Sequence, residues 1–252
     1  SGFWGSKLFD VVYNDGKTVL YGPTGDQKTY LEPDGIEISP NFLAKNTSET
    51  VSIKTASDYD RKFSTDIEGK YSGITYSGSL SSSLAFQMSL TESDDSETFM
   101  NAHNVQTYTV RRHDELDYRT QDFLDAIEGL PSSISGSDLN SYFDFFENYG
   151  THYFKRGAFG GSFFMKTVLS NSTFSDVSST EIEVALDAGF RSAVQSGEMS
   201  EDTVVNSNDT LKKYVSSSAI DFSVVGGSFT YDIVEYTNSV YTQPFLILNA
   251  FG

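Results

Sequence analysis

The longest regular pattern along the chain is an alternation of apolar and small polar residues between Ile74 and Leu90. Its odd positions are mostly serine or threonine, and its even positions are mostly apolar. Because successive side chains of a β-strand point to opposite faces, this pattern predicts a strand with one apolar face. At ~3.3 Å per residue it would extend about 55 Å, far beyond a usual strand of about 5–6 residues. Before the final Leu90, the large apolar residues of this face are Ile74, Tyr76, Leu80, Leu84, Phe86 and Met88.

A second alternation runs from Ile182 to Phe190 and places charged side chains on its polar face. Ile182, Val184, Leu186 and Phe190 share the apolar face, and Ile220 and Phe222 are in phase within a later apolar segment. The polar face carries Glu181, Glu183, Asp187 and Arg191. Taken alone, each alternating stretch fits an ordinary half-buried strand of a sheet.

The N-terminal third predicts short strands separated by turns. Leu8–Tyr13 and Thr18–Tyr21 flank the turn residues Asn14-Asp15-Gly16, so we expect them to form a hairpin. Prolines and glycines between Pro23 and Pro40 indicate a loop-rich stretch. Val105–Val110 predicts a further strand.

The middle of the chain predicts two helices followed by a glycine-containing strand. The first helix covers Tyr118–Leu130 and is ended by Pro131, and the second runs from a cap at Ser137 or Asp138 to about Tyr149. Strand character then returns over Tyr149–Leu169. Glycines inside a strand usually mark a bend, a bulge or a close backbone approach, and this strand contains Gly157, Gly160 and Gly161. Together these elements predict one α+β domain with long antiparallel strands.

Composition and charge exclude several classes of function. The chain has 252 residues, no cysteine and a formal net charge of −18. It therefore has no disulfide or thiolate chemistry, and its charge opposes binding to nucleic acid and to anionic lipid. No run approaches the ~20 apolar residues of a membrane-spanning helix. The three histidines lack metal-ligand spacing, and no nucleotide loop or nucleophile elbow occurs. We expect no catalytic residues, no metal and no cofactor, and therefore no enzyme.

One motif carries a family resemblance. Tyr149-Gly150-Thr151-His152-Tyr153, then six residues, then Gly160-Gly161, resembles the signature of the membrane attack complex/perforin (MACPF) family. The context is similar to the family as well. A helix ending in Leu130-Pro131 and an aromatic-rich helix precede the motif, and a second glycine pair, Gly226-Gly227, follows it.

The resemblance implies a bent, twisted four-stranded antiparallel sheet flanked by two helical clusters, within the wider group that includes cholesterol-dependent cytolysins. The clusters would lie at about Thr47–Glu97 and about Ser170–Val225. In pore-forming members, monomers form rings or arcs and each cluster unfurls into a membrane-inserting β-hairpin. The two alternating stretches would then supply the lipid-facing residues. Gly157, Gly226 and Gly227 would serve at hinges, and His152 would satisfy buried polar groups near the bend rather than act in catalysis.

The resemblance also implies a cellular setting. We expect a secreted protein that moves to a target-cell membrane, with roles such as cytolysis, toxin action or immune defence. Its partners would be the lipid bilayer, further copies of itself and, where another protein directs it to the membrane, a separate targeting or receptor-binding protein. We expect a single MACPF-like domain over residues 1–252, compressed or truncated at its C-terminal end, with no accessory targeting domain visible.

The Asn208-Asp209-Thr210 sequon favours an alternative function. A glycan near the tip of the second hairpin would make membrane crossing very costly. The alternative is a non-lytic adhesion, matrix or assembly scaffold that uses the same fold.

Overall fold

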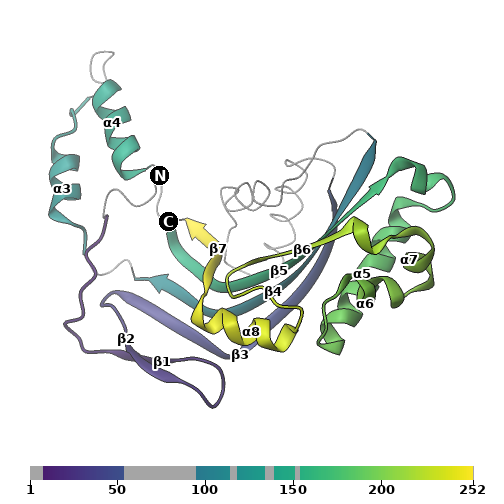
Figure 1. The fold of residues 1–252 in the computed structure, drawn as a ribbon. Coiled ribbons are helices and arrows are strands. Elements are labelled where there is room, and N and C mark those ends of the chain that lie inside the picture. The colour runs from purple at the N-terminus through teal and green to yellow at the C-terminus, as the bar shows by residue number, and fades with distance from the viewer. Residues whose placement is uncertain (1–7, 54–94, 114–117, 134–138, 151–153, 252) are drawn as a thin grey trace.

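The fold is built on one strongly curved antiparallel sheet. The computed structural model describes residues 8–53, 95–113, 118–133, 139–150 and 154–251. Three long strands form the body: β3 (Ile36–Ile53), β4 (Ser96–Arg112) and β5 (Phe154–Ser170). Two shorter strands share the far side of β5, because β6 (Ile220–Val225) pairs with its second half and β7 (Phe245–Phe251) with its first half. The expected α+β fold on a bent antiparallel sheet is thus confirmed; the sheet has five strands, of which β6 and β7 share the position beside β5 (Figure 1).

Irregularities in several strands coincide at the level where the sheet bends. On β4, Thr107 is an extra residue between Gln106, opposite Gly160, and Tyr108, opposite Phe159. At the same level β3 shifts its register between Pro40 and Lys45, and β7 shifts its own between the partners of Ala158 and Phe159. Because a bulge kinks its strand and increases the local twist, aligned bulges bend the whole sheet there.

Tyrosines hold this bend from one side. The Tyr21 hydroxyl donates to Thr107 Oγ1 at 3.1 Å, and the Tyr241 hydroxyl donates to the Asn41 carbonyl at 2.7 Å. The ring of Tyr108 stacks on that of Phe159 at 4.8 Å and meets that of Tyr21 edge-on at 5.1 Å. Tyr21 belongs to a two-stranded hairpin of β1 (Thr18–Tyr21) and β2 (Lys28–Leu31), so this hairpin is fastened to the bend.

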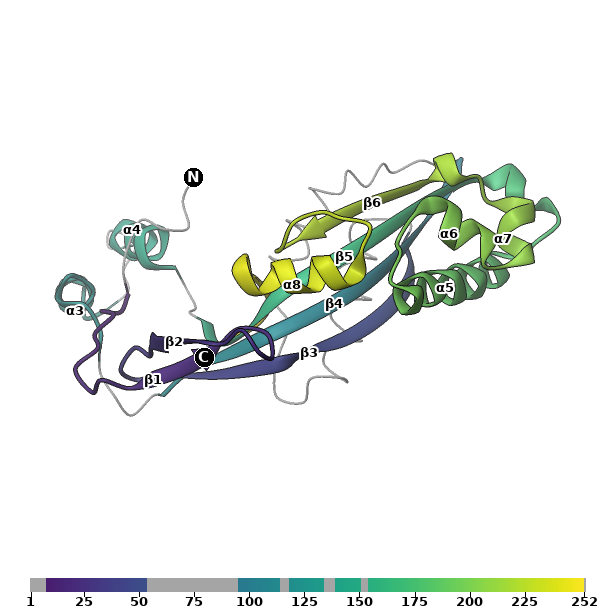
Figure 2. The ribbon, with the colours of Figure 1, turned by 60° about the horizontal axis from the view of Figure 1, so that its bottom comes forward.

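The helices occupy three places along the sheet. A compact group covers one end: the 3₁₀ turn η1 (Asn171–Ser175), α5 (Ser179–Ser196), α6 (Glu201–Asn206), α7 (Asp209–Tyr214) and the 3₁₀ turn η2 (Ser217–Ala219). The helix α8 (Ile233–Thr242) lies nearer the bend on the same side of the sheet (Figure 2). At the opposite end, α3 (Gln121–Glu128) and α4 (Leu139–Tyr149) form an arm that stands apart from the sheet (Figure 1).

A single hydrophobic core joins the sheet to these helices. Phe99 and Val105 of β4 and Phe163 and Met165 of β5 are fully buried and point to the side that carries α5–α8. Ile182, Leu186 and Phe190 of α5 and Tyr236 and Val240 of α8 complete the core from above. The helices α3 and α4 contribute no buried residue.

Two sequence predictions are wrong in this structure. Residues Leu8–Tyr13 do not pair with Thr18–Tyr21, because β1 pairs with β2 instead, and Phe9 forms an isolated bridge to Arg119. Gly22 and Gly25, both at positive φ, form the turn that allows this pairing within the stretch expected to be loop. The alternating residues Ile182–Phe190 form the helix α5 rather than a half-buried strand. The other alternating stretch, Ile74–Leu90, lies outside the described residues, as does most of the expected first cluster.

Candidate functional site

The glycine pair of β5 is where α8 reaches the sheet. A Cβ at Gly161 would stand 2.6 Å from the Tyr236 hydroxyl oxygen and 2.8 Å from a methyl carbon of Val240, both on α8. A Cβ at Gly160 would collide with the Val105 carbonyl oxygen. Real Cβ atoms do not approach other atoms this closely. The pair therefore provides the close backbone approach that its sequence position predicted.

The second glycine pair forms the turn between β6 and α8. Gly226 and Gly227 both have a φ near +70°, which a residue with a side chain adopts only at a cost. A Cβ at Gly226 would collide with the Gly160 carbonyl oxygen, so the two glycine pairs lie against each other. The Ser228 N–H donates to Ser239 Oγ at 2.8 Å, and the Gly227 N–H donates to the Gln243 carbonyl at 2.8 Å. Both acceptors lie at the C-terminal end of α8, so the turn is fixed to that end of the helix.

Aromatic rings seal this junction. The ring of Phe163 contacts the rings of Phe222, Phe229 and Tyr236 at centroid distances of 5.4, 5.8 and 5.5 Å. Phe229 and Tyr231, in the loop before α8, are about half exposed. Burial raises the pKa of the Tyr236 hydroxyl, which stays protonated above Gly161.

The helices α5–α7 have strong local end signals. Ser178 and Glu181 form a reciprocal capping box at the start of α5, and Gly197 ends the helix at a φ of 86°. The hydrogen bonds from Ser178 hold the pKa of the Glu181 carboxyl below its usual value. Ser200 and Asn208 cap the starts of α6 and α7, where their side-chain oxygens accept from the Thr203 and Thr210 N–H groups. These caps explain why the segment is helical although its residues also alternate.

Most of the predicted apolar face of this segment is buried beneath the helices. Ile182, Leu186 and Phe190 have no exposed surface, because a spacing of four residues returns to the same side of a helix. Val184 differs from these residues. In a strand it would share their face, but in the helix α5 it points elsewhere and 64% of its surface is exposed. Ile220 is buried at the start of β6, and Phe222 packs against the core from β6.

The group of helices is attached to the loop before α8 by a short ladder. Glu198 and Asp232 face each other in an isolated antiparallel bridge. On either side, the Met199 N–H donates to the Tyr231 carbonyl at 2.7 Å and the Ile233 N–H donates to the Gly197 carbonyl at 3.0 Å. The Tyr231 hydroxyl also donates to a Glu201 carboxylate oxygen at 3.3 Å, and that charge raises the pKa of Tyr231. This attachment was not predicted from the sequence.

Further contacts join the helices to the end of the sheet. Ser179 Oγ donates to the Glu97 carboxylate on β4, and the Asn171 N–H donates to the Asp95 carbonyl at 2.9 Å. Within the sheet at this end, Lys166 of β5 forms an ion pair of 3.6 Å with Asp221 of β6. The sheet and the helices are thus held together by a few polar contacts in addition to the apolar core.

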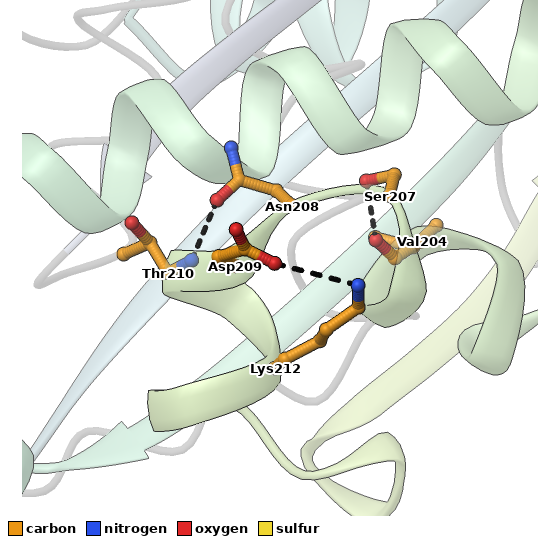
Figure 3. Close-up of polar contacts among 6 residues, drawn as sticks. All are labelled: Val204, Ser207, Asn208, Asp209, Thr210 and Lys212. Atoms are coloured by element: carbon orange, nitrogen blue, oxygen red, sulfur yellow. Dashed lines mark hydrogen bonds and ion pairs between the residues drawn. The ribbon is translucent and has the colours of Figure 1, made fainter.

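Asn208 lies in the short link between α6 and α7 (Figure 3). Its Oδ1 accepts a hydrogen bond of 2.7 Å from the Thr210 N–H, while Lys212 reaches Asp209 at 3.4 Å. Asn208 also lines a cavity of about 680 Å³ together with the exposed Val184. Because Oδ1 holds the cap, the side-chain amide nitrogen, to which a glycan would be attached, is left outside this hydrogen bond.

Comparison with known proteins decides the family. The MAC/Perforin domain model matches residues 3–248. This chain belongs to the MAC/Perforin family. The fold agrees, since the structure aligns with GNIP1Aa from Chromobacterium piscinae at a TM-score of 0.62 and 14% identity, over 98% of this chain and 46% of that one.

Two curated relatives of this MAC/Perforin domain match over a shorter segment. They are the 67 kDa subunits of perivitellin-2 from Pomacea maculata and Pomacea canaliculata, 38% and 36% identical over 72 residues. That segment is 29% of this chain and 13% of each subunit. The chain thus spans less than half of GNIP1Aa, and its match covers a small part of the perivitellin-2 subunits.

The MAC/Perforin signature residues can now be located. Tyr149 ends α4, where its ring contacts those of Phe123 and Phe145, and its hydroxyl donates to the Asp122 carbonyl at 3.2 Å. Gly150 follows with a φ of 77°. Gly157 pairs with Val110 on β4 below the bend. Thr151, His152 and Tyr153 lie outside the described residues, as do Ile74, Tyr76, Leu80, Leu84, Phe86 and Met88. In the parts of the chain that the structure describes, no helix has the length and hydropathy to cross a bilayer.

Proposed function

We propose that this MAC/Perforin domain is a pore-forming subunit whose residues 171–219 convert from helices into a membrane-inserting β-hairpin. The observation that carries the proposal is the position of β5 and β6. They pair in register from Ser162–Val225 to Thr167–Ile220 and lead directly into the two ends of the helical segment. The stem of an extended hairpin is therefore already formed.

The length and pattern of the helical segment support this conversion. A strand that crosses a bilayer needs only about 9–11 residues, and each half of segment 171–219 exceeds this. The alternation from Ile182 to Phe190 suits a barrel strand, with its apolar side chains toward lipid and its charged side chains toward the lumen. Closure of such strands into a barrel satisfies every backbone group, which an isolated hairpin cannot do in lipid.

The glycine turn supports a hinge at the base of this hairpin. For the segment to extend along β5 and β6, α5–α7 must leave the sheet, and the ladder to residues 231–233 must open. Gly226 and Gly227 connect β6 to α8 at backbone angles that only glycine adopts freely. Rotation at this turn would let α8 move away from Gly161 while β6 keeps its pairing.

A disulfide between residues 198 and 232 tests the proposal. The flanking hydrogen bonds make this pair a non-hydrogen-bonded antiparallel site, where Cα atoms are ~4.5 Å apart and a disulfide fits. Residue 198 lies near the middle of segment 171–219, at the expected hairpin tip. The Glu198→Cys/Asp232→Cys variant should release no dye from loaded liposomes when oxidised and should recover release on reduction.

The chain's lack of cysteine makes this experiment specific. The Glu198→Ser/Asp232→Ser variant controls for loss of the two carboxylates, including the α8 cap at Asp232, and should behave like the reduced form. Equal dye release by the oxidised and reduced forms would overturn the proposed conversion.

A non-lytic scaffold is the second candidate, and the Asn208 sequon favours it. A glycan on Asn208 would have to cross the bilayer with the hairpin, because this residue lies within segment 171–219. Mass spectrometry of protein secreted from eukaryotic cells measures its occupancy. Asn208→Asp removes the sequon but keeps an oxygen acceptor for the α7 cap. If Asn208 is fully glycosylated and Asn208→Asp releases no more dye than the parent, the scaffold function is favoured over the pore.

A further inference from the structure

The cavity beside Asn208 lies between the start of α5 and the helix α7. Its volume of about 680 Å³ is within the range of roughly 300–1,000 Å³ that is usual for small-ligand pockets. Val177, Val184 and Ala188 give it apolar surface, and Asp176 and Tyr214 add polar groups. The cavity therefore combines apolar and polar walls.

The walls of this cavity are fixed by contacts within the protein. The capping box of Ser178 and Glu181 holds the start of α5, and the side chain of Asn208 caps α7. The Lys213 ammonium group donates to the Tyr214 hydroxyl at 2.8 Å and lies 4.6 Å from the centre of its ring. A ligand would therefore enter a site that is already formed, which limits the entropy lost on binding.

The chemistry of the walls suits a sugar ring. A pyranose has an apolar face of C–H groups and a rim of hydroxyl groups. Val184 and Ala188 are exposed and offer apolar surface to the first, while the Asp176 carboxylate and the Thr210 hydroxyl offer hydrogen bonds to the second. Among the described residues that line the cavity there is no lysine or arginine, so an anionic ligand is disfavoured.

Asn208 connects this cavity to a source of sugar. It lines the cavity and begins the sequon Asn208-Asp209-Thr210. Its Oδ1 accepts from the Thr210 N–H at 2.7 Å, so attachment of a glycan to the amide nitrogen leaves the α7 cap in place (Figure 3). A glycan on this nitrogen starts at the cavity wall, and covalent attachment gives its first sugars a high effective concentration there.

We infer that the first sugars of an N-linked glycan on Asn208 occupy this cavity and hold α5 and α7 together. A ligand that binds the helical form and not the extended form shifts the equilibrium toward the helices. The glycan would thereby act as a lock against conversion of segment 171–219. This lock rests on the proposed function, whereas the packing of the sugars in the cavity does not.

Comparison of two expression hosts tests the packing. The parent and Asn208→Asp are each prepared from eukaryotic secreting cells and from bacteria, which separates the effect of the glycan from that of the substitution. Amide hydrogen exchange in α5 and α7 should be on the order of tenfold slower in the glycosylated parent than in the bacterial parent. Asn208→Asp should exchange at the same rate from both hosts.

Two further variants locate the sugars. Ala188→Gln places a larger neutral side chain in the cavity, so it should abolish the slowing in the glycosylated protein and leave exchange of the bacterial protein unchanged. Asn171→Asp removes a sequon whose asparagine is exposed and does not line the cavity. It is the matched control, and the slowing should persist in it.

The outcomes separate the packing from pore formation. An unoccupied Asn208 in protein from eukaryotic cells, equal exchange of the glycosylated and bacterial parents, or full slowing in Ala188→Gln would overturn the inference. So would slowing of the bacterial parent by added N,N′-diacetylchitobiose without slowing by the attached glycan, since the sugar would then come from another molecule. Slowed exchange in the glycosylated parent, with no dye release by Asn208→Asp from either host, would support the packing and count against the pore.

Discussion

At the scale of single residues, the glycines of the signature act by leaving out a side chain. Gly161, Gly226 and Gly227 lie where β5, β6 and α8 converge, and Gly160 lies against Val105 of β4. The sequence predicted a bend, a bulge or a close backbone approach at Gly160 and Gly161. The structure has all three, since the aligned bulges of the sheet stand directly beside Gly160.

Gly161→Ala should destabilise the folded domain. The added methyl group would press on the Tyr236 hydroxyl and on Val240, and overpacking of this kind costs about 1–3 kcal/mol. The free energy of unfolding in urea measures the effect. Gly129→Ala is the control, because its Cβ would make only ordinary contacts at 3.4 and 3.7 Å; it should stay within about 0.5 kcal/mol. Equal stability of both variants would contradict the close packing of α8.

His103 should make the fold sensitive to acid. It is 2% exposed on β4, and burial lowers its pKa from 6.5 to about 4. Below pH 6.5 the unfolded chain takes up a proton that the folded chain refuses until about pH 4. Stability contributed by neutral His103 is therefore complete above pH 6.5 and falls by about 3 kcal/mol as the pH drops to 4. The difference between parent and His103→Gln in urea unfolding should grow smaller over this range, and a constant difference would contradict the assignment.

At the scale of elements, the segment 171–219 shows what a sequence pattern can and cannot decide. Ile182, Leu186 and Phe190 satisfy both a period of two and a spacing of four, so the alternation alone could not distinguish strand from helix. The capping box at Ser178 and Glu181 and the glycine at 197 were visible signals for a helix. The helix predicted at Tyr118–Leu130 and the helix predicted to end at about Tyr149 were placed nearly correctly. Thr120 and Pro131 mark the two ends of the first helix, and the aromatic spacing marks the second.

Contacts between segments far apart in the chain could not be predicted from the sequence. Pairing of Thr18–Tyr21 with Lys28–Leu31 depends on positive φ at Gly22 and Gly25, and local propensity did not favour it over a turn at Asn14-Asp15-Gly16. The Glu198–Asp232 ladder and the tyrosine contacts at the bend join residues far apart in the chain. Such contacts are fixed by the assembled sheet rather than by any local pattern.

Val184 separates the two forms of this element. It is exposed in α5, but it would face lipid in a hairpin with Ile182 and Leu186. Val184→Asp should leave the stability of the soluble domain within about 0.5 kcal/mol, whereas a charge facing lipid costs up to about 2–4 kcal/mol. Dye release from liposomes should therefore fall while thermal unfolding stays unchanged. Glu183→Lys, at the neighbouring lumen-facing position, is the control and should retain release. Full activity of Val184→Asp would count against the hairpin register.

At the scale of the whole molecule, charge governs how closely one copy approaches another. A net charge of −18 makes copies repel one another at a distance. Salt shortens the range of this repulsion, from about 30 Å at 0.01 M to about 3 Å at 1 M.

Assembly should therefore increase with salt. From about 0.01 M to about 1 M salt, screening of the net repulsion should increase association. Mass photometry across this range measures the profile. A profile that is flat with salt would contradict the electrostatic account.

The central claim is that residues 171–219 change from helix to strand on the membrane. Because the chain has no cysteine, single cysteines at successive positions from 181 to 190 can each carry one environment-sensitive fluorophore. In solution, apolar emission should follow the buried face of the helix, at 182, 185, 186, 189 and 190 but not at 184 and 188. On leaking liposomes, apolar emission should appear at every even position and at no odd one. Persistence of the helical pattern on leaking liposomes would contradict the claim.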